Sequence, residues 1–91
     1  NNSGQVCCSI KRLYVPRVME HSMLQGLLKQ SSSLAVGNPL SAETNFGPLV
    51  SKRQQQRVHG YVQDAVARGA KILCGGTLDS SMQGFFYPFT V

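Results

Sequence analysis

Hydrophobic side chains recur at helical spacing in two separate parts of the chain. Within residues 17–34 they lie three and four positions apart, which predicts a helix over this segment: Met23, Leu24, Leu27 and Leu28. The serine run at 31–33 is expected to fray the end of this helix. A longer series follows, in which the later apolar residues lie three, four, seven and eight positions after the first: Val58, Tyr61, Val62, Ala65 and Val66. Such a series forms one continuous face, so it predicts a second, amphipathic helix.

The residues at both ends of this second helix match known end signals. Ser51, followed three positions later by Gln54, fits a capping box, in which the serine hydroxyl and the glutamine amide satisfy backbone N–H groups of the first turn. At the other end, the positive charge of Arg68 favours the negative pole of the helix, and Gly69 can adopt the left-handed conformation that ends a helix. We therefore expect the helix to lie between Ser51 and Gly69.

Short runs of β-branched and aromatic residues predict extended segments on either side of the helices. Residues 10–15, closed by Pro16, and residues 70–74 are both predicted to be strands, and residues 84–91 are predicted to be extended. Loops are predicted at three stretches rich in glycine, proline or polar residues: 37–39, 47–48 and 77–83. The resulting order, β-α-loop-α-β-loop-β, predicts an α/β layer architecture.

The composition indicates a soluble globular segment. The 91 residues are 42% hydrophobic and 14% charged, and no apolar run approaches the roughly 18 residues that a membrane span needs. The start lacks the basic and apolar regions of a signal peptide, and no membrane partner is predicted. The chain does not begin with Met and it ends on an apolar stretch, so we expect both ends to be cuts through a longer protein.

Basic residues outnumber acidic ones by nine to four, which gives a formal net charge of +5. A small basic nucleic-acid-binding module is therefore one hypothesis. The basic residues are scattered, however, and their one cluster, at 52–57, has no aromatic side chains on which bases could stack. The distribution favours a solvated surface, and no nucleic-acid partner is predicted.

Three cysteines, Cys7, Cys8 and Cys74, occur in no metal-binding or disulfide spacing. His21 and His59 are isolated from them in the sequence, so no metal site is predicted. Free thiols are typical of a reducing environment, which predicts a cytoplasmic location or another reducing intracellular compartment.

Residues 2–8, with the sequence Asn-Ser-Gly-Gln-Val-Cys-Cys, form the one candidate reactive site. Gly4 lets the backbone turn sharply, and a thiol just after such a turn can be presented at a cleft with its own backbone N–H available to a developing oxyanion. Cysteine attacks as the thiolate, so the site needs a base or an environment that favours the thiolate. No convincing base is present, because His21 and His59 both lie within predicted helices. An inert buried cysteine is the alternative interpretation of these residues alone.

Residues 2–7 also begin a series of ordered sequence blocks. The first block reads Asn-x-Gly-Gln-x-Cys and is followed, five positions after the cysteine, by Arg12. The later blocks are Val36-Gly37-Asn38-Pro39, Phe46-Gly47-Pro48-Leu49-Val50-Ser51, Gln54 with Val58, Gly69-Ala70-Lys71-Ile72-Leu73-Cys74-Gly75-Gly76 and Gly84-Phe85-Phe86-Tyr87-Pro88. In content, order and spacing they resemble the region around the active-site cysteine of the NAD(P)-dependent aldehyde dehydrogenases. The resemblance covers essentially the whole chain.

This resemblance implies that residues 1–91 are a fragment of a three-layer α/β catalytic domain of aldehyde dehydrogenase type, with the cofactor-binding domain absent. Cys7 matches the catalytic nucleophile of the family, because it is the second residue after Gln5. The implied reaction oxidises an aldehyde to a carboxylic acid with NAD or NADP. It proceeds through a thiohemiacetal and a thioester on Cys7. The general-base Glu and oxyanion Asn of the family are expected before the cysteine, so the 91 residues alone are predicted to be inactive.

Two further positions are implied to lie near the cofactor. Gln54 and Arg57 match positions that approach the cofactor ribose in some family members, and their i, i+3 spacing puts both on one helix face. A capping glutamine and a solvated arginine are the alternative interpretation. Cys8 and Cys74 match no catalytic role, and are expected to be a neighbour of the pocket and a packing residue, respectively.

The resemblance also implies an aldehyde as the small-molecule substrate and a homo-oligomer, a dimer or a tetramer, as the assembled protein. A non-catalytic relative that acts as a structural or oligomer-interface protein is the alternative from a different functional class. An intact general-base Glu and oxyanion Asn in the parent protein would favour the enzyme.

Overall fold

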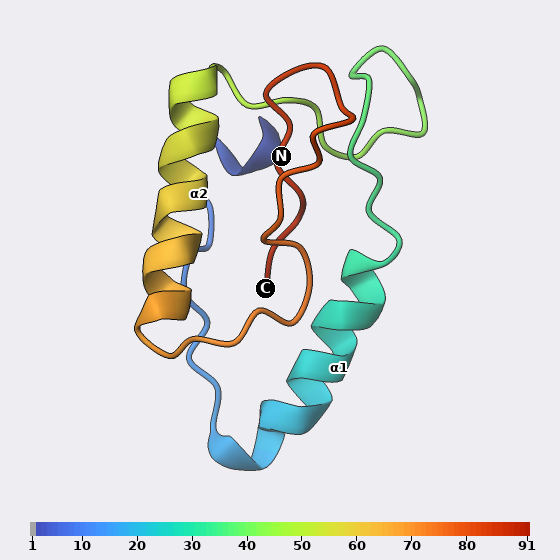
Figure 1. Cartoon of the computed structure of the whole chain (residues 1–91). Coiled ribbons are helices and arrows are strands. Elements are labelled where there is room, and N and C mark those ends of the chain that lie inside the picture. The colour runs from blue at the N-terminus through green and yellow to red at the C-terminus, as the bar shows by residue number, and fades with distance from the viewer. Residues whose placement is uncertain (1) are drawn as a thin grey trace.

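Two helices flank a long, irregular C-terminal segment (Figure 1). The computed structural model describes residues 2–91 of the chain. Its α-helices are α1, Glu20–Ser31, and α2, Lys52–Ala67, and short 3₁₀ turns lie at Asn2–Gly4 and Arg17–Met19. In Figure 1 the C-terminal segment, drawn in red, runs between the two helices, and the N-terminal turn lies beside the first half of α2.

The first helix is shorter than its hydrophobic pattern predicted. A 3₁₀ turn follows Pro16, the α-helix begins only at Glu20, and residues 32–34 lie beyond its end. The hydroxyls of the three consecutive serines at 31–33 each donate to the carbonyl three residues earlier, at 2.8 Å. Such side-chain bonds compete with the helical hydrogen-bond ladder, which explains why the helix stops at the serine run.

Both ends of the second helix lie where the sequence predicted them. The Ser51 hydroxyl accepts a hydrogen bond from the Gln54 backbone N–H at 3.2 Å and so caps the first turn. Within residues 2–91 the Gln54 amide makes no reciprocal bond, so half of the predicted capping box forms.

At the C-terminal end of α2, Gly69 has a φ of 95°. The Gly69 N–H donates to the Val66 carbonyl, and the Ala70 N–H donates to the Ala65 carbonyl, both at 2.9 Å. These are the two bonds of a Schellman motif.

We expect Ser51→Ala to loosen the first turn of α2, because the Gln54 N–H then loses its acceptor. The expected cost is about 1 kcal/mol in the free energy of opening this turn, measured as faster amide hydrogen exchange at Gln54. Ser51→Asp keeps an acceptor and should restore the protection, whereas Ser80→Ala, in an exposed turn, should leave it unchanged. Equal exchange at Gln54 in Ser51→Ala and the unmodified protein would contradict the cap.

The predicted strands at 10–15 and 70–74 do not form within residues 2–91, where no β-strand is present. Residues 10–15 make no backbone–backbone hydrogen bond to any other described residue. A strand is defined by pairing with a neighbour, so a segment with strand propensity but no neighbour stays merely extended. The β-α layer order therefore stays a prediction.

Backbone pairing in the described residues is limited to isolated contacts. The N–H groups of Leu73 and Cys74 donate to the Val91 carbonyl at 2.8 and 3.4 Å, and the Val91 N–H donates to the Cys74 carbonyl at 3.2 Å. A single parallel bridge joins Val36 and Phe46. These contacts hold the predicted second strand against the C-terminal segment without extending into a ladder.

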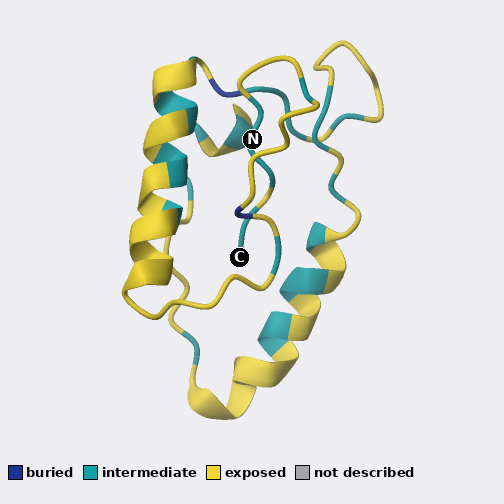
Figure 2. Cartoon of the chain, in the orientation of Figure 1, coloured by how far each residue is buried: buried dark blue, intermediate teal, exposed yellow. Residues whose placement is uncertain are grey.

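The apolar face of α1 turns toward the rest of the chain, as its pattern predicted. The four half-buried hydrophobic residues within this helix are the four that carried the pattern: Met23, Leu24, Leu27 and Leu28. Figure 2 shows this half-buried stripe on the side of α1 that faces the C-terminal segment. The face of α2 is only partly covered, since Val58 and Val62 are half-buried while Tyr61 is 63% exposed.

Large hydrophobic side chains remain in contact with solvent over much of the described chain. Ile10, Tyr14, Val18 and Leu40 are 86 to 93% exposed, whereas Leu49, at 8%, is the one buried hydrophobic residue in positions 2–91. A chain of this size buries a smaller share of its surface than a large domain does. With so little apolar burial, hydrogen bonds between residues far apart in the sequence help to hold the N-terminal turn, α2 and the C-terminal segment together.

Neither helix in this part of the chain is long and apolar enough to cross a membrane.

The C-terminal segment binds α2 through side chains of the helix. Gln55 Nε2 donates to the Phe86 carbonyl at 2.7 Å, and His59 Nδ1 lies 3.1 Å from the Tyr87 hydroxyl. Burial raises the pKa of Tyr87, so the phenol keeps its proton and donates it to the Gly76 carbonyl, 3.4 Å away.

Candidate active site

The candidate reactive site begins with a left-handed turn. Asn2, Ser3 and Gly4 have φ values of 49°, 51° and 75°. For residues with a side chain this conformation costs roughly 1–2 kcal/mol, less for asparagine, and glycine adopts it freely. The Gln5 backbone N–H closes the turn by donating to the Asn2 carbonyl at 3.0 Å. Strain of this kind persists only where surrounding contacts hold it in place.

Two hydrogen bonds from a distant segment hold this turn. The Ser3 hydroxyl donates to the Gly47 carbonyl at 2.9 Å, across 44 positions of sequence. The Val50 backbone N–H donates to Gln5 Oε1, also at 2.9 Å, across 45 positions. The loop that leads into α2 therefore positions the turn that precedes the cysteines.

This loop, residues 47–50, is itself anchored. The Leu49 side chain is buried, and its backbone N–H donates to the Phe85 carbonyl at 2.8 Å. Ser51, the N-cap of α2, directly follows Val50. The turn thus rests on a loop that is fixed to both the C-terminal segment and the start of α2.

Cys7 and Cys8 occupy the two central positions of the next turn, in which the Ser9 N–H donates to the Val6 carbonyl at 3.2 Å. Both thiols are free and exposed. Within residues 2–91 the Cys7 backbone N–H has no hydrogen-bond acceptor and the Cys7 thiol has no hydrogen-bond partner. An unpaired N–H beside an accessible thiol can stabilise the oxyanion that forms when the thiolate adds to a carbonyl group.

No general base contacts the Cys7 thiol among the described residues. His59 is engaged with Tyr87, and His21 lies exposed in the first turn of α1. The same part of the chain, residues 2–91, holds no group of three histidine, cysteine or acidic side chains that could bind a metal ion. These residues therefore present a thiol and a donor N–H, but no base that touches them.

The two residues predicted to approach the cofactor lie in the first half of α2. Gln54 is half-buried and Arg57 is exposed. The Arg57 guanidinium lies over the Tyr61 ring, 5.8 Å from its centroid, and its Nε and Nη2 are each 3.4 Å from the Tyr61 hydroxyl. No hydrogen bond joins Gln54 or Arg57 to Cys7 within residues 2–91. The link between them is indirect and runs through the Gln5–Val50 bond.

Ser3 and Gln5 lie within the Asn-x-Gly-Gln-x-Cys motif, but the motif by itself does not indicate that their side chains hold the turn. Their partners lie on a loop that is separated from them by the whole of α1, so no local spacing marks the pair. The only signal in the sequence is a polar residue on each side of Gly4, since such residues often bond backbone groups at turns.

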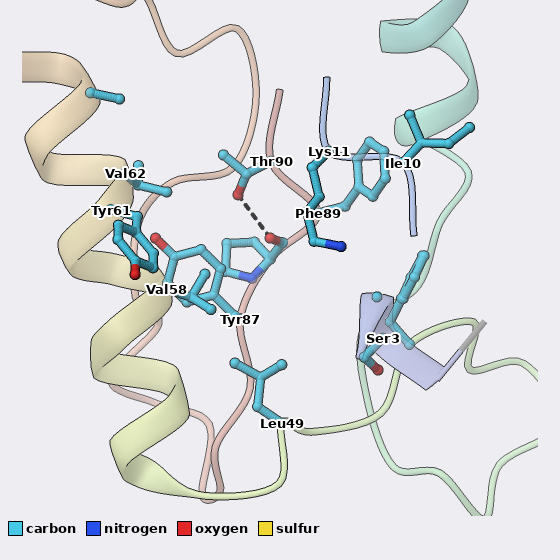
Figure 3. Close-up of a pocket in the computed structure, with 14 residues that line it drawn as sticks. Ser3, Ile10, Lys11, Leu49, Val58, Tyr61, Val62, Tyr87, Phe89 and Thr90 are labelled. Atoms are coloured by element: carbon cyan, nitrogen blue, oxygen red, sulfur yellow. Dashed lines mark hydrogen bonds between the residues drawn. The ribbon is translucent and has the colours of Figure 1, made fainter. Parts of the chain in front are cut away.

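An apolar cavity of about 560 Å³ lies between the turn, α2 and the C-terminal segment (Figure 3). The lining residues labelled in Figure 3 include Val58, Tyr61 and Val62 from α2, Tyr87 and Phe89 from the C-terminal segment, and Ser3 from the turn. Cys7 is not among the lining residues. The cavity is therefore distinct from the position of the candidate nucleophile.

Comparison with known proteins identifies the class. The model of the aldehyde dehydrogenase family matches residues 1–91, so the chain belongs to the aldehyde dehydrogenase family. A 3-sulfolactaldehyde dehydrogenase from Priestia aryabhattai is similar to it, with 38% identity over 91 residues, which are 100% of this chain and 18% of that protein.

Solved structures show the same fold. An aldehyde dehydrogenase from Mycobacterium tuberculosis, complexed with NAD+, is 31% identical with a TM-score of 0.90. An NADP-dependent enzyme from E. coli is 30% identical, also with a TM-score of 0.90. Each match covers 97% of this chain and 18% of the other chain. The chain thus has the local fold of its family and spans about a fifth of the length of these relatives.

Proposed function

We propose that the whole protein oxidises an aldehyde to a carboxylic acid with NAD or NADP, and that Cys7 is its nucleophile. The observation that carries this proposal is an exposed Cys7 thiol whose own backbone N–H is unpaired within residues 2–91, held just after a strained and tethered turn. Similarity to a 3-sulfolactaldehyde dehydrogenase and to NAD+- and NADP-linked enzymes supports the reaction class.

In the proposed reaction the Cys7 thiolate forms a C–S bond to the aldehyde carbon, and the carbonyl π electrons move to the oxygen. The Cys7 N–H donates to that oxygen and stabilises its charge. A bound nicotinamide supplies the hydride acceptor. Once the hydride has left the carbon, the carbonyl re-forms as a thioester, and water cleaves the C–S bond to release the acid and the thiol.

Gln54 and Arg57 are proposed to approach the ribose of the cofactor. Both lie on one face of α2, and the Arg57 contacts to the Tyr61 hydroxyl, at 3.4 Å, are long for hydrogen bonds. The guanidinium can therefore exchange them for an oxygen of a sugar or a phosphate, which fits a partial contribution to a dinucleotide site. The chain has no Gly-x-Gly-x-x-Gly phosphate loop, so the main cofactor site is proposed to lie elsewhere in the protein.

For the whole protein we further propose a three-layer α/β catalytic domain, a homo-oligomeric assembly and a reducing intracellular location. In the proposed three-layer α/β catalytic domain, residues 10–15 and 70–74 pair with strands from other parts of the protein. The unpaired backbone of residues 10–15 and the exposed Tyr14 side chain support this arrangement. A homo-oligomer follows from the family resemblance, and the three free cysteines support a reducing intracellular compartment.

Iodoacetamide labelling tests the assignment of the nucleophile. In the whole protein we expect Cys7 to be alkylated about tenfold or more faster than Cys74, as measured by mass spectrometry of the peptides. Cys74 is half-buried, and its Sγ lies 3.6 Å from Ser31 Oγ, whereas Cys7 is exposed.

Cys8 is the matched control for this labelling, because it is exposed in the same turn but has no proposed catalytic role. Faster labelling of Cys7 than of Cys8 supports an activated thiol. Labelling of Cys74 before Cys7, or equal rates at Cys7 and Cys8, would contradict the assignment.

A further inference from the structure

We propose that Gln5 is a positioning residue that couples the Cys7 turn to the start of α2 through its hydrogen bond with Val50. The inference rests on the proposed function, in which Cys7 is the nucleophile. It concerns how that nucleophile is placed, and Gln5 itself is not required to touch the substrate.

The Gln5 amide is held from two sides. Its Oε1 accepts from the Val50 backbone N–H at 2.9 Å, and its Nε2 donates to the Asn2 carbonyl at 3.3 Å. The two contacts define the orientation of the amide, because an N–H donor faces the oxygen and a carbonyl faces the nitrogen. The side chain is half-buried and lies two residues before Cys7. Movement of this amide is therefore transmitted to the thiol over a very short stretch of backbone.

The turn needs such a bond because its own conformation is unfavourable. Ser3 has a side chain and a φ of 51°, and the next residue, Gly4, is also left-handed. Of the bonds that hold residues 2–5, those from Ser3 to Gly47 and from Val50 to Gln5 are the ones that reach another part of the described chain. Loss of the Gln5 bond would free the end of the turn that lies closer to Cys7.

The same bond relates the thiol to α2. Val50 directly precedes Ser51, whose hydroxyl caps the helix at Gln54. Gln54 and Arg57, the residues proposed to approach the cofactor, lie on the helix that begins at this cap. The path from Cys7 through Gln5, Val50 and Ser51 therefore sets the position of the nucleophile relative to the proposed cofactor-binding face.

Gln5→Met in the whole protein tests this coupling, because methionine has a similar length and no strong acceptor. We expect kcat to fall about tenfold to a hundredfold, since a displacement of about 1 Å can cost this much, while KM for the aldehyde changes much less. The rate of Cys7 alkylation by iodoacetamide should fall in parallel. Gln5→Glu is not a rescue variant, because a carboxylate cannot donate to the Asn2 carbonyl and its negative charge near Cys7 disfavours the thiolate.

Gln56→Met is the matched control, because Gln56 is an exposed glutamine of α2 with no side-chain hydrogen bond within residues 2–91. It should leave both rates at the level of the unmodified protein. Should Gln5→Met not fold, Gln5→Asn is the second variant, since its shorter side chain cannot bring an oxygen to the Val50 N–H. The same fall in both rates is then expected.

The inference is overturned if Gln5→Met, or Gln5→Asn in its place, loses no more activity and no more alkylation rate than Gln56→Met. Failure of the proposed function looks different. In that case the unmodified protein itself shows no aldehyde oxidation and no preference for Cys7 over Cys8 in labelling.

Discussion

Replacing Cys7 by serine is expected to abolish aldehyde-dependent formation of NADH or NADPH by the whole protein. The fall in kcat/KM should be on the order of 10⁴-fold or more, the size of effect seen when an enzyme loses its covalent nucleophile. A serine hydroxyl is almost entirely un-ionised at neutral pH, so the species that attacks the carbonyl is lost even though the side chain keeps its size. Absorbance of the reduced cofactor at 340 nm provides the measurement.

Cys8→Ser is the control for this substitution, because Cys8 is the other exposed thiol of the same turn. It should retain activity to within about tenfold, the range of an indirect packing effect near an active site. An inactive Cys8→Ser beside an active Cys7→Ser would transfer the role of nucleophile to Cys8. An unmodified protein that binds cofactor but oxidises no aldehyde would instead favour the non-catalytic alternative.

Gly75→Ala is expected to destabilise the region where the C-terminal segment meets the predicted second strand. Gly75 has a φ of 70°, and a Cβ at this position would collide with the Phe89 carbonyl oxygen and lie 2.7 Å from Thr90 Oγ1. The left-handed conformation and the backbone collision together should lower the free energy of unfolding by about 3 kcal/mol. Urea unfolding of the whole protein, followed by fluorescence or circular dichroism, measures this.

Gly60→Ala makes the same chemical change at a position where the opposite sign is expected. Gly60 lies inside α2, and a Cβ there would meet no other atom within 4 Å. Alanine in a helix interior is favoured over glycine by about 1 kcal/mol, so this variant should be more stable than the unmodified protein. A destabilisation of similar size in both variants would show that the Gly75 geometry is not the cause.

The sequence predicted α2 well and α1 less well, for a common reason. The Ser51 cap, the apolar face that begins at Val58 and the glycine stop at Gly69 are all local signals, and the helix ends where they lie. The predicted range of α1 continued to Leu34, but the serine hydroxyls at 31–33 bond backbone carbonyls and the helix ends at Ser31. That competition was visible in the sequence only as a tendency of the serine run to fray the helix.

The strands at 10–15 and 70–74 show where local reasoning fails. Their residues have the composition of strands, but within positions 2–91 neither forms one. Helical hydrogen bonds join residues four positions apart, whereas the bonds of a strand go to a partner that its own sequence does not specify. Composition can therefore predict that a segment is extended, but it cannot supply the neighbour.

For the candidate site, the sequence by itself determined which side chains are present: a Cys7 thiol after an Asn-Ser-Gly-Gln turn, with Gln54 and Arg57 one helical turn apart. Only the tertiary structure decided how they are held. The bonds from Ser3 to Gly47 and from Val50 to Gln5 join positions 44 and 45 residues apart. Such pairs meet only when the intervening helix and loop have folded back, because no local periodicity brings distant residues together.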